Sequence, residues 1–147
     1  SFFIYYIIFV LVPVVGPTFY YKAVGLGDIA QGIFPNVHDH FNFSQDCLPS
    51  PGYEKGIFYQ MVEDAKDAGE RPTAAFPSSH VGISTVLMLL TWHSGNRKLL
   101  YVLLPFYILL CLATVYIQAH YAIDALAGLV TGAPFYFLLM WVYKQPK

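Results

Sequence analysis

Charged side chains are scarce in this chain, and that scarcity excludes an ordinary soluble fold. Of 147 residues, 12% are charged and 56% are hydrophobic. A soluble domain of this length cannot bury so large an apolar fraction. Cysteine is sparse too: Cys47 and Cys111 are the only two, and their spacing indicates neither a disulfide nor a metal site. Internal repeats and low-complexity tracts are absent.

Long apolar runs are what the chain does contain. About 20 helical residues, rising about 1.5 Å each, are needed to cross about 30 Å of hydrocarbon. The second run reaches that length only if it begins near Pro77. We predict an all-α fold, a polytopic transmembrane helix bundle that forms one membrane-embedded domain over residues 1–147. The predicted spans are residues 2–21, 78–94, 99–117 and 121–143.

Basic residues set the expected orientation of these spans. Arg97 and Lys98 follow the second span, and Lys144 and Lys147 follow the fourth, with no acidic residue beside them. Such ends are typically cytoplasmic. The connection over residues 22–76 carries more acidic than basic residues, so we expect it on the extracytoplasmic side. The C-terminus is then cytoplasmic.

The long connection holds one predicted helix and one histidine-rich triplet. Ile57, Met61 and Ala65 fall on one helical stripe within residues 53–68, which predicts a short amphipathic helix near the outer surface. The triplet His38-Asp39-His40 contains metal-ligating residue types, but a lone triplet in a polar loop is typical of solvated side chains. We predict no metal site there.

Two histidines, His80 and His120, lie where apolar runs meet the same membrane face. An ionisable group at bilayer depth costs about 2.5 to 3.5 kcal/mol, so its presence usually marks a function or a partner. The alternative is structural, with both histidines capping or cross-linking helices. Their shared face favours a common phosphoryl-transfer site.

The residues before His80 are typical of a helix N-terminus. Pro77 fixes φ, and Ser78 and Ser79 are good capping residues. The unpaired backbone N–H groups of a first helical turn, together with the positive end of the helix dipole, form a cradle for an anion. The residues before His80 therefore predict an anion-binding helix N-terminus.

The second histidine has a carboxylate four residues away. This spacing would put His120 and Asp124 on one helix face, where the carboxylate could accept from one ring nitrogen and fix the tautomer. The other nitrogen could then attack phosphorus. His80 could protonate the leaving alkoxide and later deprotonate the acceptor, which is covalent catalysis in two steps.

These segments resemble a known family. Ala75 to Gly82, and Tyr116 to Asp124, are similar to the second and third signature motifs of the type 2 phosphatidic acid phosphatase superfamily. The resemblance implies a core of six transmembrane helices, of which four are visible here. Because Ser1 is not a methionine and an apolar run follows at once, we expect the other helices upstream.

The resemblance also assigns roles. It implies that His120 is the nucleophile that forms a phosphohistidine, that His80 is the general acid and that Asp124 is the orienting carboxylate. Ser78 and Ser79 are then phosphate binders. Neither a metal nor another cofactor is required.

Two motifs depart from the family pattern. Ala113-Thr114 stands where a Ser-Arg pair is usual, so one phosphate-binding cation is missing. In the first motif, Arg71-Pro72 is present, but Asp64 occupies the usual lysine position and Lys66 is too close by two residues. Arg71 and Lys66 are candidate phosphate binders, and a solvated surface charge is the alternative for each.

The function remains open between three possibilities. The lead hypothesis is a membrane-embedded lipid phosphatase acting on a phosphate monoester or pyrophosphate. Thr114, Tyr116 and Tyr121 also match the inositol phosphorylceramide synthase branch, which would imply transfer of a phospho-headgroup to a lipid hydroxyl. The third possibility is a non-catalytic membrane subunit that retains the fold.

The expected partners follow from these hypotheses. They are the lipid bilayer and a phospholipid, polyprenyl phosphate or sphingolipid phosphate as substrate. We expect no nucleic acid partner, and the sequence leaves homo- or hetero-oligomers open. Aromatic residues that could line an acyl-chain site, or simply pack between helices, are Phe106, Tyr107, Phe135, Tyr136 and Phe137.

Overall fold

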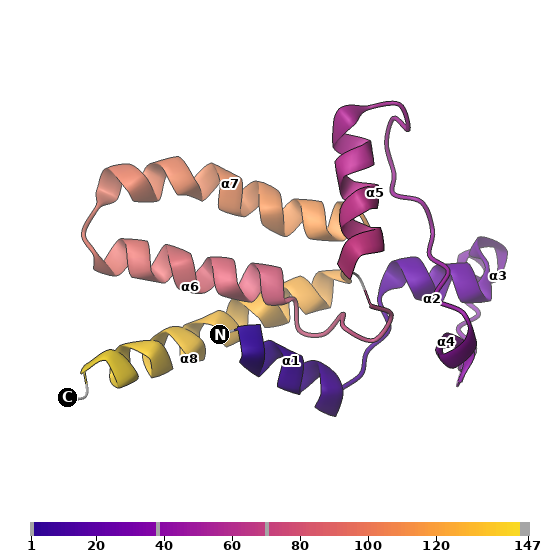
Figure 1. The fold of residues 1–147 in the computed structure, drawn as a ribbon, viewed down its shortest axis with the longest axis horizontal. Coiled ribbons are helices and arrows are strands. Elements are labelled where there is room, and N and C mark those ends of the chain that lie inside the picture. The colour runs from indigo at the N-terminus through magenta and orange to yellow at the C-terminus, as the bar shows by residue number, and fades with distance from the viewer. Residues whose placement is uncertain (1, 38, 70, 145–147) are drawn as a thin grey trace.

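Apart from one isolated β-bridge, the regular elements in the part of the chain that the structure describes are all helices. The computed structural model describes residues 2–37, 39–69 and 71–144. Its helices are α1 (Phe2–Leu11), α2 (Pro17–Val24), α3 (Leu26–Ala30), α4 (His40–Phe43), α5 (Ile57–Gly69), α6 (Ser79–His93), α7 (Arg97–Tyr116) and α8 (Ala122–Lys144). In Figure 1, α6, α7 and α8 form the body of the molecule, and α2 to α5 gather at one end. The predicted all-α class is confirmed.

Capping residues define the hairpin of α6 and α7. The Ser78 hydroxyl accepts from the N–H of Val81 at 3.5 Å and caps α6. The chain then turns at Gly95, whose φ of 73° lies in the left-handed region that glycine adopts freely. Asn96 caps α7 by accepting from the N–H of Leu99 at 3.1 Å. Local sequence thus specifies both the turn and the start of the next helix.

Helices α6 and α8 approach closely because glycines face the contact. A Cβ atom at Gly132 would lie 2.6 Å from the Cβ of Thr85, and one at Gly128 would collide with the carbonyl of Ser78. Both glycines are buried. This close approach holds the N-terminal end of α6 against the first turns of α8.

Helix α1 packs over the same contact through one aromatic side chain. Tyr5 is fully buried, and its hydroxyl occupies the space that a side chain at Gly82 would need. The Tyr5 hydroxyl is 3.0 Å from the Thr131 hydroxyl, and its ring meets Phe135 edge-on with centroids 5.1 Å apart. Phe135, one of the residues suggested for an acyl-chain site, therefore packs between helices.

Two of the four predicted spans are supported by helix length. Within the described residues, α7 with 20 residues and α8 with 23 are long and apolar enough to cross a membrane. Helix α6 forms as predicted, but its 15 residues give a rise of only about 22 Å. The segment predicted as a span at residues 2–21 is not one continuous helix, because α1 ends at Leu11 and α2 begins at Pro17.

The break in that first segment has a local cause. Pro13 has no N–H to continue the helical bonding of α1, which ends at Leu11. Pro17 then occupies the first turn of α2, where a missing N–H costs nothing. The intervening strip is extended, and Val14 forms an isolated parallel bridge with Ala74. This strip becomes part of the functional site.

The amphipathic helix of the long connection is confirmed as α5. In Figure 1 it stands upright at the end of the bundle, while α6 and α7 run across the view. Its exposed apolar residues include Ile57, Phe58 and Met61. The His38-Asp39-His40 triplet cannot be placed as a unit, since His38 lies outside the described residues.

The glycine contact yields a stability prediction. Gly132→Ala should destabilise the bundle by about 1 to 3 kcal/mol, because the new methyl group overpacks Thr85. Gly27→Ala is the matched control, since Gly27 lies in α3 with no neighbouring atom within 4 Å of the new Cβ. Thermal unfolding in detergent measures both variants. Equal melting temperatures for the two would contradict the packing described here.

Candidate functional site

Three chain segments meet at the end of the bundle to form the site. They are the strip after α1, the residues that precede α6, and the turn between α7 and α8. The N–H of Ala75 donates to the carbonyl of Val14 at 3.2 Å, and the N–H of Thr18 donates to the carbonyl of Gln118 at 3.2 Å. The N–H of Ser78 donates to the carbonyl of Asp124 at 3.0 Å. Backbone bonds therefore fix the segments that carry the two histidines.

The turn that carries His120 is held in one conformation. Gln118 has a φ of 60°, an uncommon left-handed conformation for a residue with a side chain. The N–H of His120 then donates to the carbonyl of Thr114 at 3.1 Å. His120 is consequently tied to the C-terminal end of α7 and directed back across the end of the bundle.

The two predicted histidines come together. The ring centroids of His80 and His120 are 6.3 Å apart, and their planes are inclined by 59°. Only 7% of His120 is exposed, whereas His80 is exposed. One tetrahedral phosphoryl group can bridge two imidazoles at this separation. The arrangement joins a buried ring to an accessible one at a single pocket.

A backbone carbonyl orients the buried ring. Nδ1 of His120 lies 2.7 Å from the carbonyl oxygen of Ala75. A carbonyl can only accept, so in the neutral ring Nδ1 carries the proton and Nε2 keeps its lone pair. The geometry therefore presents Nε2 as a base or nucleophile.

Asp124 does not make the hydrogen bond predicted for it. Its Oδ2 accepts from the N–H of Tyr121 at 2.8 Å and lies 4.0 Å from Nδ1 of His120. The prediction placed both residues on one helix face, but α8 begins only at Ala122, after His120. Asp124 instead closes the first turn of α8, as an acidic residue three positions into a helix often does. It is 1% exposed and close enough to act on His120 by its charge.

The environment of His120 keeps the ring neutral at physiological pH. Burial lowers the pKa of His120 to about 4, the bond to Ala75 opposes this shift, and His80 adds a smaller lowering effect. Desolvation disfavours the charged imidazolium, which explains the direction. A neutral ring retains the lone pair that attack on phosphorus requires.

The start of α6 lies beside the histidine pair. Ser79 and His80 line the pocket, and the first-turn amides of α6 have no acceptor within the helix. Ser78 is 0% exposed, and its hydroxyl already accepts from Val81. Ser79 can therefore contact a phosphate in the pocket. Ser78 does not line the pocket and instead caps the N-terminus of α6.

A large cavity opens over the histidines. Its volume is about 630 Å³, and it lies between α1, α5 and the C-terminal half of α7. Its apolar walls include Tyr5, Phe9, Phe58, Met61, Leu110 and Ile117. Of the apolar stripe predicted on α5, Met61 and Ala65 reach this cavity. The cavity combines a polar end with walls suited to hydrocarbon.

The aromatic residues suggested from sequence for an acyl chain are not in these walls. Tyr107 bonds to the Thr85 hydroxyl at 2.7 Å, and Tyr136 bonds to Nδ1 of His93 at 3.0 Å. The aromatic lining comes instead from α1, α2 and α5. The sequence carries no signal for which aromatic residues line the cavity, because this depends on how α1 and α2 pack against the other helices.

Lys66 lies at the pocket but is already fully bonded. Its ammonium donates to the carbonyl of Leu48 at 2.8 Å, to the Ser50 hydroxyl at 3.1 Å and to Glu63 Oε1 at 3.1 Å. An ammonium has three protons, so none is left for a phosphate. The prediction of Lys66 as a phosphate binder is not supported by this geometry. Lys66 instead fastens the loop at Leu48 and Ser50 to α5.

Glu63, the carboxylate that pairs with Lys66, is also bonded within the fold. Burial tends to raise the pKa of Glu63, but bonds from Ser50 and Lys66 outweigh it and leave the pKa below its usual value. Glu63 Oε1 also accepts from the N–H of Ser50 at 3.0 Å. The charged pair is therefore part of the fold of the loop.

Arg71 is the remaining predicted cation at the pocket. It is exposed, lines the large cavity, and has no side-chain hydrogen bond or ion pair within the described residues. Thr114, which stands where a family arginine is usual, is 6% exposed and lines the same cavity. The Thr114 hydroxyl donates to the carbonyl of Cys111 at 3.0 Å, so it supplies no positive charge.

No metal cluster accompanies these residues. Among residues 2–37, 39–69 and 71–144, no group of three His, Cys, Asp or Glu side chains could hold a metal ion. The polar groups at the site are imidazoles, hydroxyls, amides and one guanidinium. Together they can bind an oxyanion and move a proton.

Comparison with protein families identifies the chain. The model of the PAP2 superfamily matches residues 1–138, and the chain belongs to this superfamily, the type 2 phosphatidic acid phosphatases. The family indicates phosphatase-type activity and, with the apolar helices α7 and α8, a membrane protein. Comparison with curated proteins and with solved structures finds no match.

The buried ring yields a titration prediction. In nitrogen-detected NMR of the histidines, His120 should remain the Nδ1–H tautomer from neutral pH downward and gain its second proton with a midpoint near 4. Protonation is delayed because the charged ring is poorly solvated. The His120→Ala spectrum assigns the signal. A midpoint near 6.5, the ordinary histidine value, or an Nε2–H tautomer would contradict the geometry.

The two cations yield a contrasting pair of predictions. Lys66→Met should lower the melting temperature, since it removes the bonds that Leu48, Ser50 and Glu63 make with the ammonium, and should change vanadate affinity by less than about twofold. Arg71→Gln should leave the melting temperature unchanged and weaken vanadate binding by roughly tenfold or more, because charged hydrogen bonds are worth about 1.5 to 3 kcal/mol. Unfolding scans and vanadate titration measure both. The opposite pattern would restore Lys66 as the phosphate binder.

Proposed function

We propose that this protein is a membrane-embedded lipid phosphatase that hydrolyses a lipid phosphate monoester or pyrophosphate through a phosphohistidine. The observation that carries the proposal is the 2.7 Å bond between His120 Nδ1 and the carbonyl of Ala75. This bond leaves Nε2 with its lone pair at a pocket that His80 shares. Membership of the PAP2 superfamily supports the same class of reaction.

The first step forms the covalent intermediate. Nε2 of His120 attacks phosphorus, the bond from phosphorus to the lipid oxygen breaks, and His80 gives its proton to the leaving alkoxide. Ser79, the first-turn amides of α6 and Arg71 stabilise the charge on the other phosphoryl oxygens. The imidazole of His120 becomes positively charged in this step, and Asp124 at 4.0 Å favours that charge.

The second step returns the enzyme to its starting state. Water gives a proton to His80 as its oxygen bonds to phosphorus, and the bond from phosphorus to Nε2 breaks. Inorganic phosphate leaves, and His120 regains its lone pair. No redox change occurs, and the protein residues alone supply the acid, the base and the nucleophile.

The cavity supports an amphiphilic substrate. Its polar end holds the histidines, and its apolar walls come from α1, α5 and α7, which present hydrophobic side chains. A phospholipid, polyprenyl phosphate or sphingolipid phosphate has this division between an anionic head and a hydrocarbon tail. We propose that the tail lies between α1, α5 and α7.

The proposed membrane orientation follows from charge. The basic residues at the α6–α7 turn, Arg97 and Lys98, favour the cytoplasmic side for that end of the bundle. The histidine pair lies at the opposite end of α6. The site would then act at the extracytoplasmic leaflet.

Loss of either catalytic imidazole should abolish turnover. His120→Ala should prevent both phosphate release and covalent labelling, and His80→Ala should lower release by about 10²- to 10⁴-fold, the usual contribution of a general acid. The measurement is phosphate release from radioactive lipid phosphates, with acid-labile label on the wild type. His93→Ala is the matched control, because His93 lies outside the pocket and bonds Tyr136.

One outcome would end the proposal. Normal phosphate release by His120→Ala would show that another group attacks phosphorus. Retained release by His120→Ala together with loss in His93→Ala would place the chemistry at the other end of α6.

A further inference from the structure

Helix α5 exposes large apolar side chains that no other helix covers. Ile57, Phe58 and Met61 are 74%, 83% and 61% exposed. Among the described residues, the closely packed helix pairs are formed by α1, α2, α3, α6, α7 and α8, and α5 belongs to none of them. A contiguous apolar surface of this kind marks a site of interaction.

The two sides of α5 differ in polarity. Side chains three and four positions apart lie on the same side of a helix. The apolar side is formed by Phe58, Met61, Val62 and Ala65. The polar side repeats with the same spacing and is formed by Gln60, Glu63, Asp64 and Asp67. The helix is therefore amphipathic, as a helix at a boundary between water and hydrocarbon must be.

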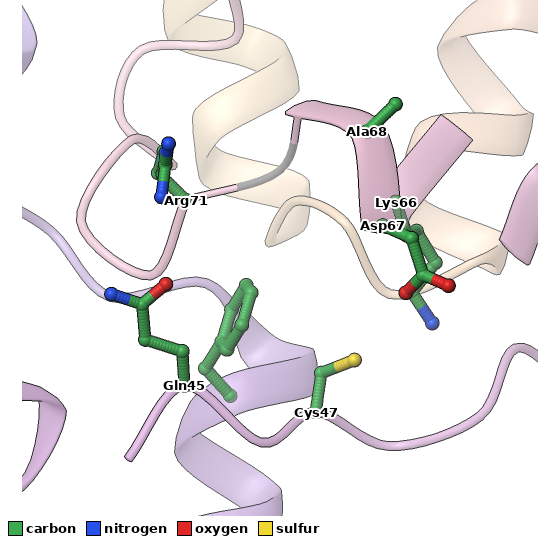
Figure 2. A pocket seen from close by; sticks show the side chains of 7 residues that line it. Gln45, Cys47, Lys66, Asp67, Ala68 and Arg71 are labelled. Carbon is green, nitrogen blue, oxygen red and sulfur yellow. The ribbon is translucent and has the colours of Figure 1, made fainter. Parts of the chain in front are cut away.

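The polar side of α5 is fastened to the loop that precedes the helix. Lys66 donates to the carbonyl of Leu48 at 2.8 Å, and Glu63 accepts from the N–H of Ser50 at 3.0 Å. Figure 2 shows Lys66 and the adjacent Asp67 extending from α5 on the side of this loop. The loop thus holds α5 by its polar side and leaves the exposed apolar side chains uncovered.

The direction of α5 fits a membrane surface. In Figure 1, α5 runs across the direction of α6 and α7, at the end of the bundle opposite the α6–α7 turn. Helix α7 is long and apolar enough to cross a membrane, so a helix that runs across it lies along the membrane plane. Amphipathic helices in this position bury their apolar side by about 5 to 10 Å at the boundary between headgroups and acyl chains.

The charges of α5 favour a neutral leaflet over an anionic one. Asp64 and Asp67 are exposed, and Lys66, the one basic residue of α5, is 8% exposed and bonded through its three protons. Helices that bind anionic lipids present free Lys or Arg side chains on their polar face. Burial of apolar side chains is therefore the interaction that α5 can offer a lipid surface.

We propose that α5 docks on the outer leaflet of a zwitterionic membrane, with Phe58 and Met61 among the acyl chains and Asp67 in water. The inference rests on the proposed function for the orientation of the bundle. Phe58, Met61 and Ala65 also line the histidine cavity. A docked α5 places this wall of the cavity level with the hydrocarbon from which a lipid phosphate enters.

The depth of spin labels on α5 tests the docking. The full chain, with Cys47→Ser and Cys111→Ser, carries one nitroxide at Phe58→Cys or Met61→Cys on the apolar side, or at Gln60→Cys on the polar side. It is reconstituted in phosphatidylcholine vesicles with a water-soluble nickel chelate on both sides of the membrane. Oxygen concentrates in hydrocarbon, so we expect a severalfold higher ratio of oxygen to nickel collisions at the two apolar positions than at the polar control. Replacing part of the phosphatidylcholine with phosphatidylserine should leave this ratio unchanged or lower it.

Three results would overturn the docking. Frequent nickel collisions at all three positions would place α5 in water. Apolar positions shielded from both reagents would mean that protein covers them, with spin–spin broadening if the cover is a second copy of the chain. A ratio that rises with phosphatidylserine would make an anionic surface the partner.

Phosphate release from a lipid phosphate in the same vesicles separates the docking from the proposed function. Release by protein whose labels all lie in water overturns the docking and leaves the proposed function standing. Apolar positions in hydrocarbon, in protein that releases no phosphate from any lipid phosphate, leave the docking standing and overturn the proposed function.

Discussion

The hydrogen bond between His120 Nδ1 and the Ala75 carbonyl is the interaction on which the site depends. It joins the segment before α6 to the turn between α7 and α8, and it decides which ring nitrogen is free. Because the acceptor is a backbone atom, no side-chain substitution removes it directly. The tautomer of the proposed nucleophile is thus determined by the fold.

Several other contacts keep that bond in place. The N–H of Ser78 donates to the carbonyl of Asp124, and Gly128 and Gly132 let α6 and α8 approach closely enough for this bond to form. Asp124 closes the first turn of α8, which determines where the preceding His120 is placed. Helix packing and helix capping therefore act together on the geometry of two imidazoles.

Sequence reasoning succeeded where the determinants are local. The cap at Ser78 and the long apolar runs predict α6, α7 and α8, and the pairing of His80 with His120 follows from the order of these helices. Sequence reasoning failed where the hydrogen-bond partner of a site residue is distant in the chain or is a backbone atom. Neither the Ala75 carbonyl nor the bonds that saturate Lys66 have a spacing signature, because their partners come from other parts of the chain. The prediction that Asp124 accepts a hydrogen bond from His120 on one helix face failed because α8 begins two residues after His120.

The cavity at the histidine pair combines a polar end with apolar walls, which supports an amphiphilic lipid phosphate as the proposed substrate. The most direct test of this account is an experimental structure with vanadate, which imitates phosphorus under attack. We expect vanadium bonded to Nε2 of His120, with Nδ1 still on the Ala75 carbonyl and His80 within hydrogen-bond distance of a vanadate oxygen. Vanadate bound away from His120, or bonded through Nδ1, would contradict the account.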